Sequence, residues 1–232
     1  LGGVYTHAEG YQTQATEPYS HTEGASTAAS GSASHAEGYQ TTASGRRSHA
    51  EGDGTQATGQ SSHAEGQNVI ASGPNSHAEG IQTTASGSTS HAEGSHATAS
   101  GAFSHAEGVS TNATSTGSHT EGASTAATGD YSHTEGNGTI ANNKCQHVFG
   151  EYNGVDPSSA LSSARGTYIE IVGNGATAAN RSNARTLDWS GNEMLTGTLT
   201  IGGVSGATLK VESGVLKISF NGGTTWLTVS AS

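Results

Sequence analysis

The chain repeats the stretch Ser34-His35-Ala36-Glu37-Gly38, continued by Thr41-Thr42-Ala43-Ser44-Gly45, with a period of fourteen residues. Histidine marks this period eleven times without a slip, at His7, His21, His35, His49, His63, His77, His91, His105, His119, His133 and His147. Glutamate follows two residues after each of the first ten histidines, at Glu9, Glu23, Glu37, Glu51, Glu65, Glu79, Glu93, Glu107, Glu121 and Glu135. Self-similarity at a short, fixed period predicts a solenoid in which each unit forms one coil.

The residues within each unit alternate as they do in a β-strand. Ser34 and Ala36 fall on one face of an extended segment, whereas His35 and Glu37 fall on the other face. A coiled coil is excluded, because the units lack the apolar a and d positions that it requires. The period therefore predicts an all-β fold rather than a helical one.

Alanine recurs in the second half of each unit, eight residues after each of the first ten histidines, at Ala15, Ala29, Ala43, Ala57, Ala71, Ala85, Ala99, Ala113, Ala127 and Ala141. If each unit is one coil, its two short strands face each other across a lumen that admits only alanine, serine and threonine. Successive coils stack through parallel β hydrogen bonds at roughly 4.8 Å, so eleven coils form a rod on the order of 50 Å long.

Composition and charge narrow the class of protein. Only 31% of the 232 residues are hydrophobic and 5% aromatic, so most of the chain cannot form an ordinary globular core. The net charge is −11, and residues 1–143 contain thirteen acids against two bases. An acidic rod repels nucleic acid and anionic lipid, and no apolar run is long enough to span a bilayer. We expect neither a nucleic-acid partner nor membrane insertion, and the single cysteine, Cys145, excludes an internal disulfide.

The motif Ser34-His35-Ala36-Glu37-Gly38 with Thr41-Thr42-Ala43-Ser44-Gly45 resembles the fourteen-residue repeat of YadA-like heads, which occur in trimeric autotransporter adhesins and in phage tail fibres. The resemblance covers about residues 4–150. It implies a left-handed parallel β-roll, with three rolls packed about a threefold axis. It also implies that the two residues flanking the central alanine point toward neighbouring subunits. Adhesins commonly have aliphatic residues at these two positions, whereas this chain has histidine and glutamate.

We call the eleven histidines and ten glutamates of the period the ladder. A catalytic role is disfavoured, because the same pair occurs ten times with no distinctive third partner. Imidazole and carboxylate are ligands of transition metals, but His-x-Glu repeats lack the distinct ligand cluster of a dedicated site. We therefore predict no enzyme activity, cofactor or metal. The ladder is interpreted as a trimer interface in which histidine donates a hydrogen bond to glutamate of a neighbouring chain.

The fourteen-residue repeat ends at Gln146-His147-Val148-Phe149-Gly150, where Phe149 replaces the glutamate of the earlier units. An apolar residue at this position suits a last coil, so the roll is predicted to span residues 1–150. Residues 151–197 are expected to form a connector. Within it, the stretch 181–193, with Trp189, is similar to segments that follow such rolls in tail-fibre proteins.

The remaining residues, 198–232, are expected to form a small β-rich domain. Short strands are predicted at 198–201, 208–211, 215–220 and 226–229, and Asn221-Gly222-Gly223 is a hairpin signal. Trp189, Phe220, Asn221 and Trp226 are candidate receptor contacts, since aromatic rings stack on sugars. The alternative is that the aromatic residues form the core of this small domain.

These features favour a structural and receptor-binding tail-fibre protein of a phage or phage-like particle, located in the virion tail. Its expected partners are two further copies of itself, other tail or fibre proteins, and a bacterial cell-surface receptor, expected to be a glycan. The alternative is the head of a bacterial trimeric adhesin on the cell surface. A polysaccharide-degrading tailspike would need clustered acids. Outside the ladder, residues 1–143 offer only Glu17, Asp53 and Asp130.

Overall fold

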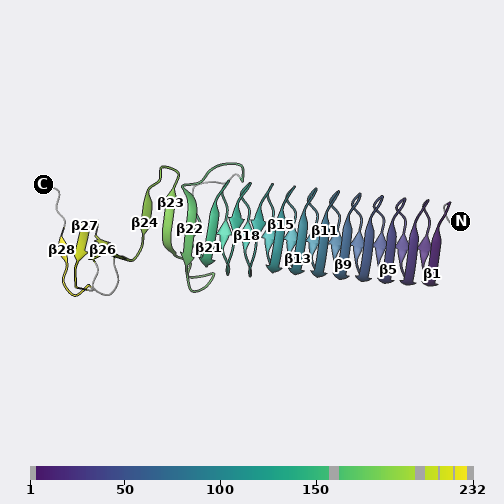
Figure 1. The fold of residues 1–232 in the computed structure, drawn as a ribbon, viewed down its shortest axis with the longest axis horizontal. Helices are drawn as coiled ribbons and strands as arrows, with labels where there is room; N and C mark the ends of the chain where they lie inside the picture. Colours follow the sequence, from purple (N-terminus) through teal and green to yellow (C-terminus); the bar gives the residue numbers. More distant parts are fainter. Residues whose placement is uncertain (1–3, 157–161, 202–206, 214, 222, 229–232) are drawn as a thin grey trace.

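A computed structural model of the chain describes residues 4–156, 162–201, 207–213, 215–221 and 223–228. The described residues contain strands, turns and bends, and none of them belongs to a helix long and apolar enough to cross a membrane. The elements follow one another along a straight rod, with β1 at one end and β28 at the other (Figure 1). The predicted all-β parallel solenoid of fourteen-residue coils is confirmed.

The first half of each coil supplies one strand to a long sheet, the first sheet. Pairing is parallel and in register, so that His35 lies beside His49, Ala36 beside Ala50 and Glu37 beside Glu51. The repeat strands of this sheet are β1 (His7–Tyr11), β3 (His21–Ala25), β5 (His35–Tyr39), β7 (His49–Asp53), β9 (His63–Gln67), β11 (His77–Ile81), β13 (His91–Ser95), β15 (His105–Val109), β17 (His119–Thr120), β19 (His133–Thr134) and β21 (His147–Glu151).

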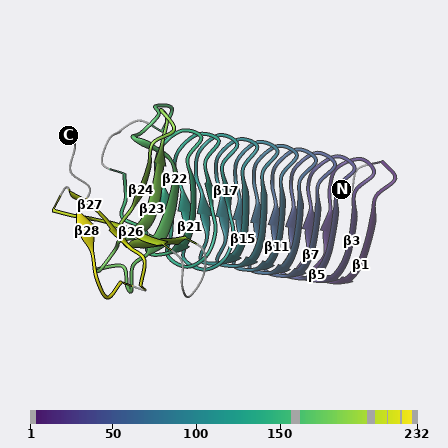
Figure 2. The ribbon, with the colours of Figure 1, turned by 60° about the vertical axis from the view of Figure 1, so that its left-hand side comes forward.

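The second half of each coil supplies a two-residue strand to a ten-stranded parallel sheet, the second sheet. Its strands stack along the rod as those of the first sheet do (Figure 2). They are β2 (Gln14–Ala15), β4 (Ala28–Ala29), β6 (Thr42–Ala43), β8 (Gln56–Ala57), β10 (Ile70–Ala71), β12 (Thr84–Ala85), β14 (Thr98–Ala99), β16 (Asn112–Ala113), β18 (Ala126–Ala127) and β20 (Ile140–Ala141).

The core of the roll is the narrow lumen between these two sheets. Ala36 and Ala43, from opposite strands of one coil, have no solvent exposure, and Thr41 and Ser34 are buried with them. In most coils the serine hydroxyl of the turn donates to a backbone carbonyl three residues earlier, as Ser34 does to Gly31 at 2.6 Å, whereas the Ser76 hydroxyl has no hydrogen-bond partner. Alanine, serine and threonine line the lumen as expected, but Val69 is also fully buried there, so the lumen is not restricted to these three residue types.

The first sheet continues beyond the repeat, although Gly150 was expected to end the roll. After a loop, β22 (Tyr168–Asn174) pairs in parallel with β21, placing Glu170 beside His147 and Ile171 beside Val148. Ile171 is fully buried and closes the lumen. The antiparallel strands β23 (Asn183–Asp188) and β24 (Glu193–Leu195) then complete the sheet. The predicted connector 151–197 therefore contributes three strands to the sheet of the roll.

The second sheet ends differently, at the open edge of β20. The side-chain amide of Asn153 takes the place of a further coil, because its Oδ1 accepts from the Ile140 N–H at 2.8 Å and its Nδ2 donates to the Ile140 carbonyl at 3.0 Å. Asn153 is fully buried. Asn153 thus satisfies both backbone groups of Ile140 that the last parallel strand would leave unpaired, and the Gln146 side chain accepts from the Asn142 N–H beside it.

The C-terminal residues form a separate four-stranded antiparallel sheet of β25 (Thr198–Ile201), β26 (Ala207–Glu212), β27 (Val215–Ser219) and β28 (Leu227–Thr228). All four strands were predicted, to within one residue at their ends. The antiparallel pairing of β27 with β28 agrees with the hairpin signal, of which Gly222 lies outside the described residues, as does Val229 of the last predicted strand.

Candidate functional site

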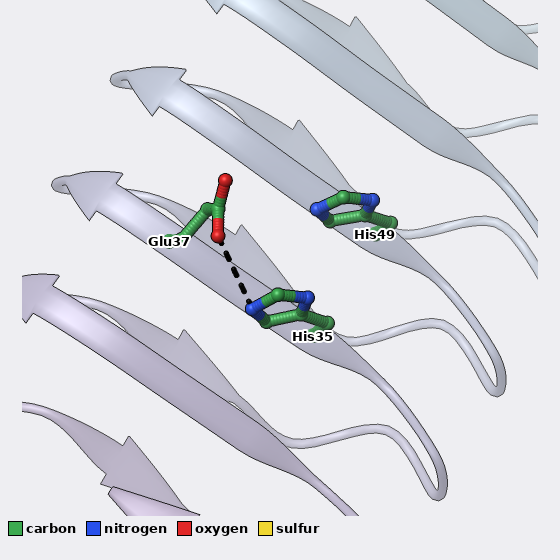
Figure 3. A group of neighbouring side chains, drawn as sticks. All are labelled: His35, Glu37 and His49. Carbon is green, nitrogen blue, oxygen red and sulfur yellow. Dashed lines mark ion pairs between the residues drawn. The ribbon is translucent and has the colours of Figure 1, made fainter. Parts of the chain in front are cut away.

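The ladder lies on the outer face of the first sheet, because strand alternation buries the alanine between each histidine and its glutamate. Ala36 is fully buried, whereas the side chains of His35 and Glu37 are 34% and 35% exposed. Figure 3 shows Glu37 beside His35, with His49 of the next coil stacked on His35. The structure therefore brings the sequence-predicted ladder residues of the successive coils into one continuous line.

The eleven imidazoles form an unbroken stack along this line. Consecutive ring centroids are 4.6–4.9 Å apart, and the planes of His35 and His49 differ by 3°. This spacing is that of parallel β-strands, so the backbone ladder imposes it on the side chains. His147 is the last imidazole of the row, and the ring of Phe149, at the glutamate position of the same coil, lies 5.3 Å from it.

Within one chain, the histidines and glutamates are near each other without being hydrogen-bonded. The distance from Nε2 to the nearer carboxylate oxygen is 3.4 Å for His35–Glu37 and 3.5 Å for His63–Glu65, beyond the usual range for an N–H···O bond. Ten of the eleven Nε2 atoms are buried and lack a hydrogen-bond partner: those of His21, His35, His49, His63, His77, His91, His105, His119, His133 and His147. The hydrogen bond to a neighbouring chain stays a prediction.

The carboxyl groups also interact along the stack. Burial raises the pKa of Glu79, and a hydrogen bond with Glu93 raises it further. Burial acts in the same direction on Glu93, but hydrogen bonds from Glu79 and Glu107 outweigh it and lower the pKa of Glu93. The pKa of Glu107 is raised, mainly by burial, while the hydrogen bond between Glu121 and Glu135 lowers the pKa of Glu121 and raises that of Glu135. The pKa shifts of these five carboxyl groups therefore alternate in direction along the stack.

Four of the ladder histidines, His63, His91, His119 and His133, favour their neutral form. Burial is the largest cause that lowers the pKa of His63, His91, His119 and His133, and the charge of a stacked neighbouring imidazolium lowers it further. The nearby glutamates oppose this shift without reversing it. A neutral imidazole keeps one ring nitrogen with a free lone pair, so the ladder can accept as well as donate.

These shifts predict a loss of stability in mild acid. Because the folded pKa values of His63, His91, His119 and His133 lie below those of the unfolded chain, their contribution is complete above about pH 6.5 and is lost as the pH falls through the folded values. The raised pKa values of Glu79, Glu107 and Glu135 have the opposite effect on stability, because these groups add stability as they are protonated. They do so at lower pH, near the ordinary titration range of carboxyl groups. We expect the melting temperature, measured in EDTA, to fall between about pH 7 and pH 5.

The matched test is the slope of melting temperature against pH. Replacing His63, His91 and His119 together by glutamine should flatten the slope, because three imidazoles with lowered pKa are removed. Replacing the exposed loop residue His96 by glutamine should leave the slope unchanged. An identical slope in the parent and in the triple variant would contradict this account.

The candidate receptor contacts lie at two places. Phe220, Asn221 and Trp226 belong to the segment that joins β27 to β28, and Phe220 is 64% exposed, which corrects the alternative that it is a core residue. Trp226 is half-buried, with the Lys210 ammonium 4.3 Å from its ring centre. Trp189 follows β23 and is half-buried under the Arg165 guanidinium, at 4.4 Å. Phe220, Asn221 and Trp226 thus share one connecting segment, whereas Trp189 lies in the turn between β23 and β24 of the first sheet.

Sequence reasoning missed a set of exposed aromatic residues on the roll. Tyr5 and Tyr19 occupy the same turn position in successive coils, with ring centroids 5.5 Å apart. Phe103 and Tyr131 occupy this position in later coils, and all four side chains are at least 60% exposed. Each of these residues lies two positions before a ladder histidine. The fourteen-residue period alone could therefore have shown that they share one turn position.

The roll also contains residues that could hold a metal. Several groups of two histidines from successive coils and one glutamate place three ligand atoms within 4.8 Å of one another.

No family model matches the chain, and a comparison with curated proteins found no match either.

Proposed function

We propose that this chain is a structural and receptor-binding fibre segment of a phage or phage-like particle, which attaches the particle to the surface of its bacterial host. The observation that carries the proposal is the ladder, a continuous polar line of half-exposed side chains with buried, unpartnered nitrogens along the whole roll. Such a line suits contact with copies of the same rod, because every level of one chain then meets the same level of another.

In this proposal three left-handed rolls pack in parallel about a common axis, with their ladders facing inward. The resemblance of the Ser-His-Ala-Glu-Gly unit to YadA-like heads supports the handedness and the threefold arrangement. Buried polar groups repeated at each level also favour one register between chains. The repeat alone would allow a slip by one coil, so the non-repeating strands β22, β23 and β24 would select the absolute register.

The architecture is tested by light scattering on the purified full chain. The expected mass is three times the chain mass of 23.1 kDa. The reason is that the ladder nitrogens need partners that one chain does not supply. A monomer at micromolar concentration would refute the trimer, and with it the fibre.

The same preparation, applied to a bacterial glycan array, locates the receptor contact. We place it on the segment between β27 and β28, where Phe220 and Asn221 are exposed at the end of the rod opposite β1 (Figure 1). Replacing Phe220 by alanine should abolish binding, because an exposed ring offers a stacking platform for a sugar.

The head of a surface adhesin is the second candidate, and one observation favours it. The N-terminal coils expose Tyr5, Tyr11, Tyr19 and Tyr39 by 52–77%, a surface on the roll itself. An adhesin would bind through the roll. Binding that survives Phe220→Ala and is lost in Tyr11→Ala with Tyr39→Ala would favour this candidate over the tail fibre.

A further inference from the structure

The distances between ladder nitrogens and carboxylate oxygens fit neither a hydrogen bond nor a bridging water. The Nε2–Oε2 distances are 3.4 Å for His35–Glu37, 3.5 Å for His49–Glu51 and 3.6 Å for His77–Glu79. A direct bond would bring these atoms to about 2.7–2.9 Å. A water hydrogen-bonded to both would hold them roughly 4.5 Å apart, from two bonds of usual length. The observed spacing falls between the two.

The same spacing fits two ligands of one metal ion. Zinc binds imidazole nitrogen at about 2.0–2.1 Å and carboxylate oxygen at about 2.0–2.2 Å, so two ligands at a tetrahedral angle are roughly 3.3–3.5 Å apart. The Nε2 atoms of ten ladder histidines are also buried and have no hydrogen-bond partner within the chain. When the imidazole is neutral, such a nitrogen can offer its lone pair to a metal ion. Side chains of the glutamates are 35–41% exposed in these coils, which leaves an approach for an ion.

The next coil supplies a third ligand. Stacking at 4.7 Å places the His49 imidazole over that of His35, and Glu37 lies beside both (Figure 3). Seven groups among the described residues keep their three ligand atoms within 4.8 Å. Five of them are His35/Glu37/His49, His49/Glu51/His63, His63/Glu65/His77, His105/Glu107/His119 and His119/Glu121/His133. Two imidazoles and one carboxylate leave a fourth position for water, the ligand set that zinc sites with an open position use. The stacked rings of His35 and His49 are 4.7 Å apart and nearly parallel, so one ion would bind both only by tilting the two rings and drawing their nitrogens to roughly 3.3–3.5 Å.

The charge of the roll also favours a cation. The ladder carries ten glutamates, and the only Lys or Arg residues in 1–143 are Arg46 and Arg47, which lie at an exposed turn away from the ladder strands. Carboxylates repeated at roughly the strand spacing repel one another, because no opposite charge lies between them. A divalent ion held between coils would supply that charge.

We propose that the ladder binds divalent transition-metal ions of the zinc class, each held by histidines of two successive coils and the glutamate between them. The proposal replaces the sequence-based expectation of no metal, and it does not depend on the proposed function. Adjacent groups share a histidine, so the five groups hold at most three ions if each imidazole binds one: two among the first three groups and one among the last two. Bound ions would tie successive coils together along one face.

The test uses the full chain, without a histidine tag, stripped with EDTA and then dialysed against zinc. Bound metal is counted by inductively coupled plasma mass spectrometry. We expect three or more ions per chain in the parent, because the five named groups can hold three and the described residues contain two further groups of this kind. The variant Glu37→Gln with Glu51→Gln and Glu65→Gln should bind two fewer, because it removes the carboxylate from the first three groups.

The matched control removes three negative charges from outside the ladder, in Glu17→Gln with Asp53→Asn and Asp130→Asn, and should bind as many ions as the parent. Circular dichroism shows whether each variant is folded. Cobalt(II), added to the stripped parent in place of zinc, should give the visible absorption of a nitrogen- and oxygen-ligated tetrahedral ion. Zinc that is not retained by the parent, or is lost equally in the control, would overturn the proposal, as would a cobalt spectrum identical to that of the free aqueous ion.

Discussion

Replacing Gly66 by alanine is expected to unfold the roll around β9 and β11. Gly66 has φ +117°, and an added Cβ would lie 2.1 Å from the carbonyl oxygen of Gly80 in the next coil. That oxygen belongs to backbone, and Gly66 and Gly80 face each other in the parallel pairing of the two strands. The methyl group can be accommodated only if the coils move apart, which breaks the backbone hydrogen bonds that stack them.

The expected cost is large. The backbone strain alone amounts to roughly 1–3 kcal/mol, and separating two coils adds the loss of their pairing. We expect more than about 4 kcal/mol, in the range that single substitutions reach only by a specific mechanism. Thermal melts followed by circular dichroism measure this effect as a lower melting temperature and a smaller folded signal.

Gly54→Ala is the matched control in the preceding coil. Gly54 also has positive φ, +68°, but an added Cβ would meet mainly the Asn68 side chain, which can move. Other coils place Gln12 and Gln40 at this loop position with φ 54°, so the position accepts a side chain. Equal losses of stability in Gly54→Ala and Gly66→Ala would mean that glycine at position 66 is not required by the close approach of the neighbouring coil.

Replacing Ala71 by leucine should be the second most damaging change. Ala71 has no solvent exposure and lies in the buried alanine cluster between the two sheets. The lumen already holds Val69 in the same coil, so little free space remains for three further carbon atoms. Overpacking a filled core costs roughly 1–3 kcal/mol, and here the backbone ladders on both sides resist expansion.

Gln60→Leu introduces the same side chain at an exposed turn and should change stability by less than about 0.5 kcal/mol. Denaturant melts of the two variants, compared with the parent, measure the difference in free energy of unfolding. If both leucines were tolerated equally, the assignment of inside and outside along the coil would be wrong. Ala85→Leu, one coil further, provides an independent repeat of the buried change.

The sequence alone was sufficient for the coil and its two faces. A period of fourteen with histidine and glutamate two residues apart implied parallel stacking in register, and alternation placed Ala36 inside. In-register stacking and strand alternation both follow from the residues of a single unit. Because the unit is repeated, every coil gives the same prediction. The four C-terminal strands were predicted for the same reason, since turn residues and alternating apolar residues are close together in the sequence.

The end of the roll could not be predicted in this way. Strand β22 joins the sheet beside β21 across a loop, with Glu170 opposite His147 although the fourteen-residue spacing has stopped. Pairing between segments separated by a loop depends on complementary surfaces rather than on a period. The capping of Ile140 by the Asn153 side chain is likewise a contact that no repeat encodes.

The ladder, too, was predicted only in part from the sequence. Its residues, its outward direction and its spacing along the rod follow from the sequence, because strand geometry fixes where each Cβ points. The distance of 3.4 Å between His35 and Glu37, and the buried Nε2 atoms without partners, appear only in the tertiary structure. They depend on side-chain rotamers, which stacking against the next coil selects, and no pattern of residue types contains that information.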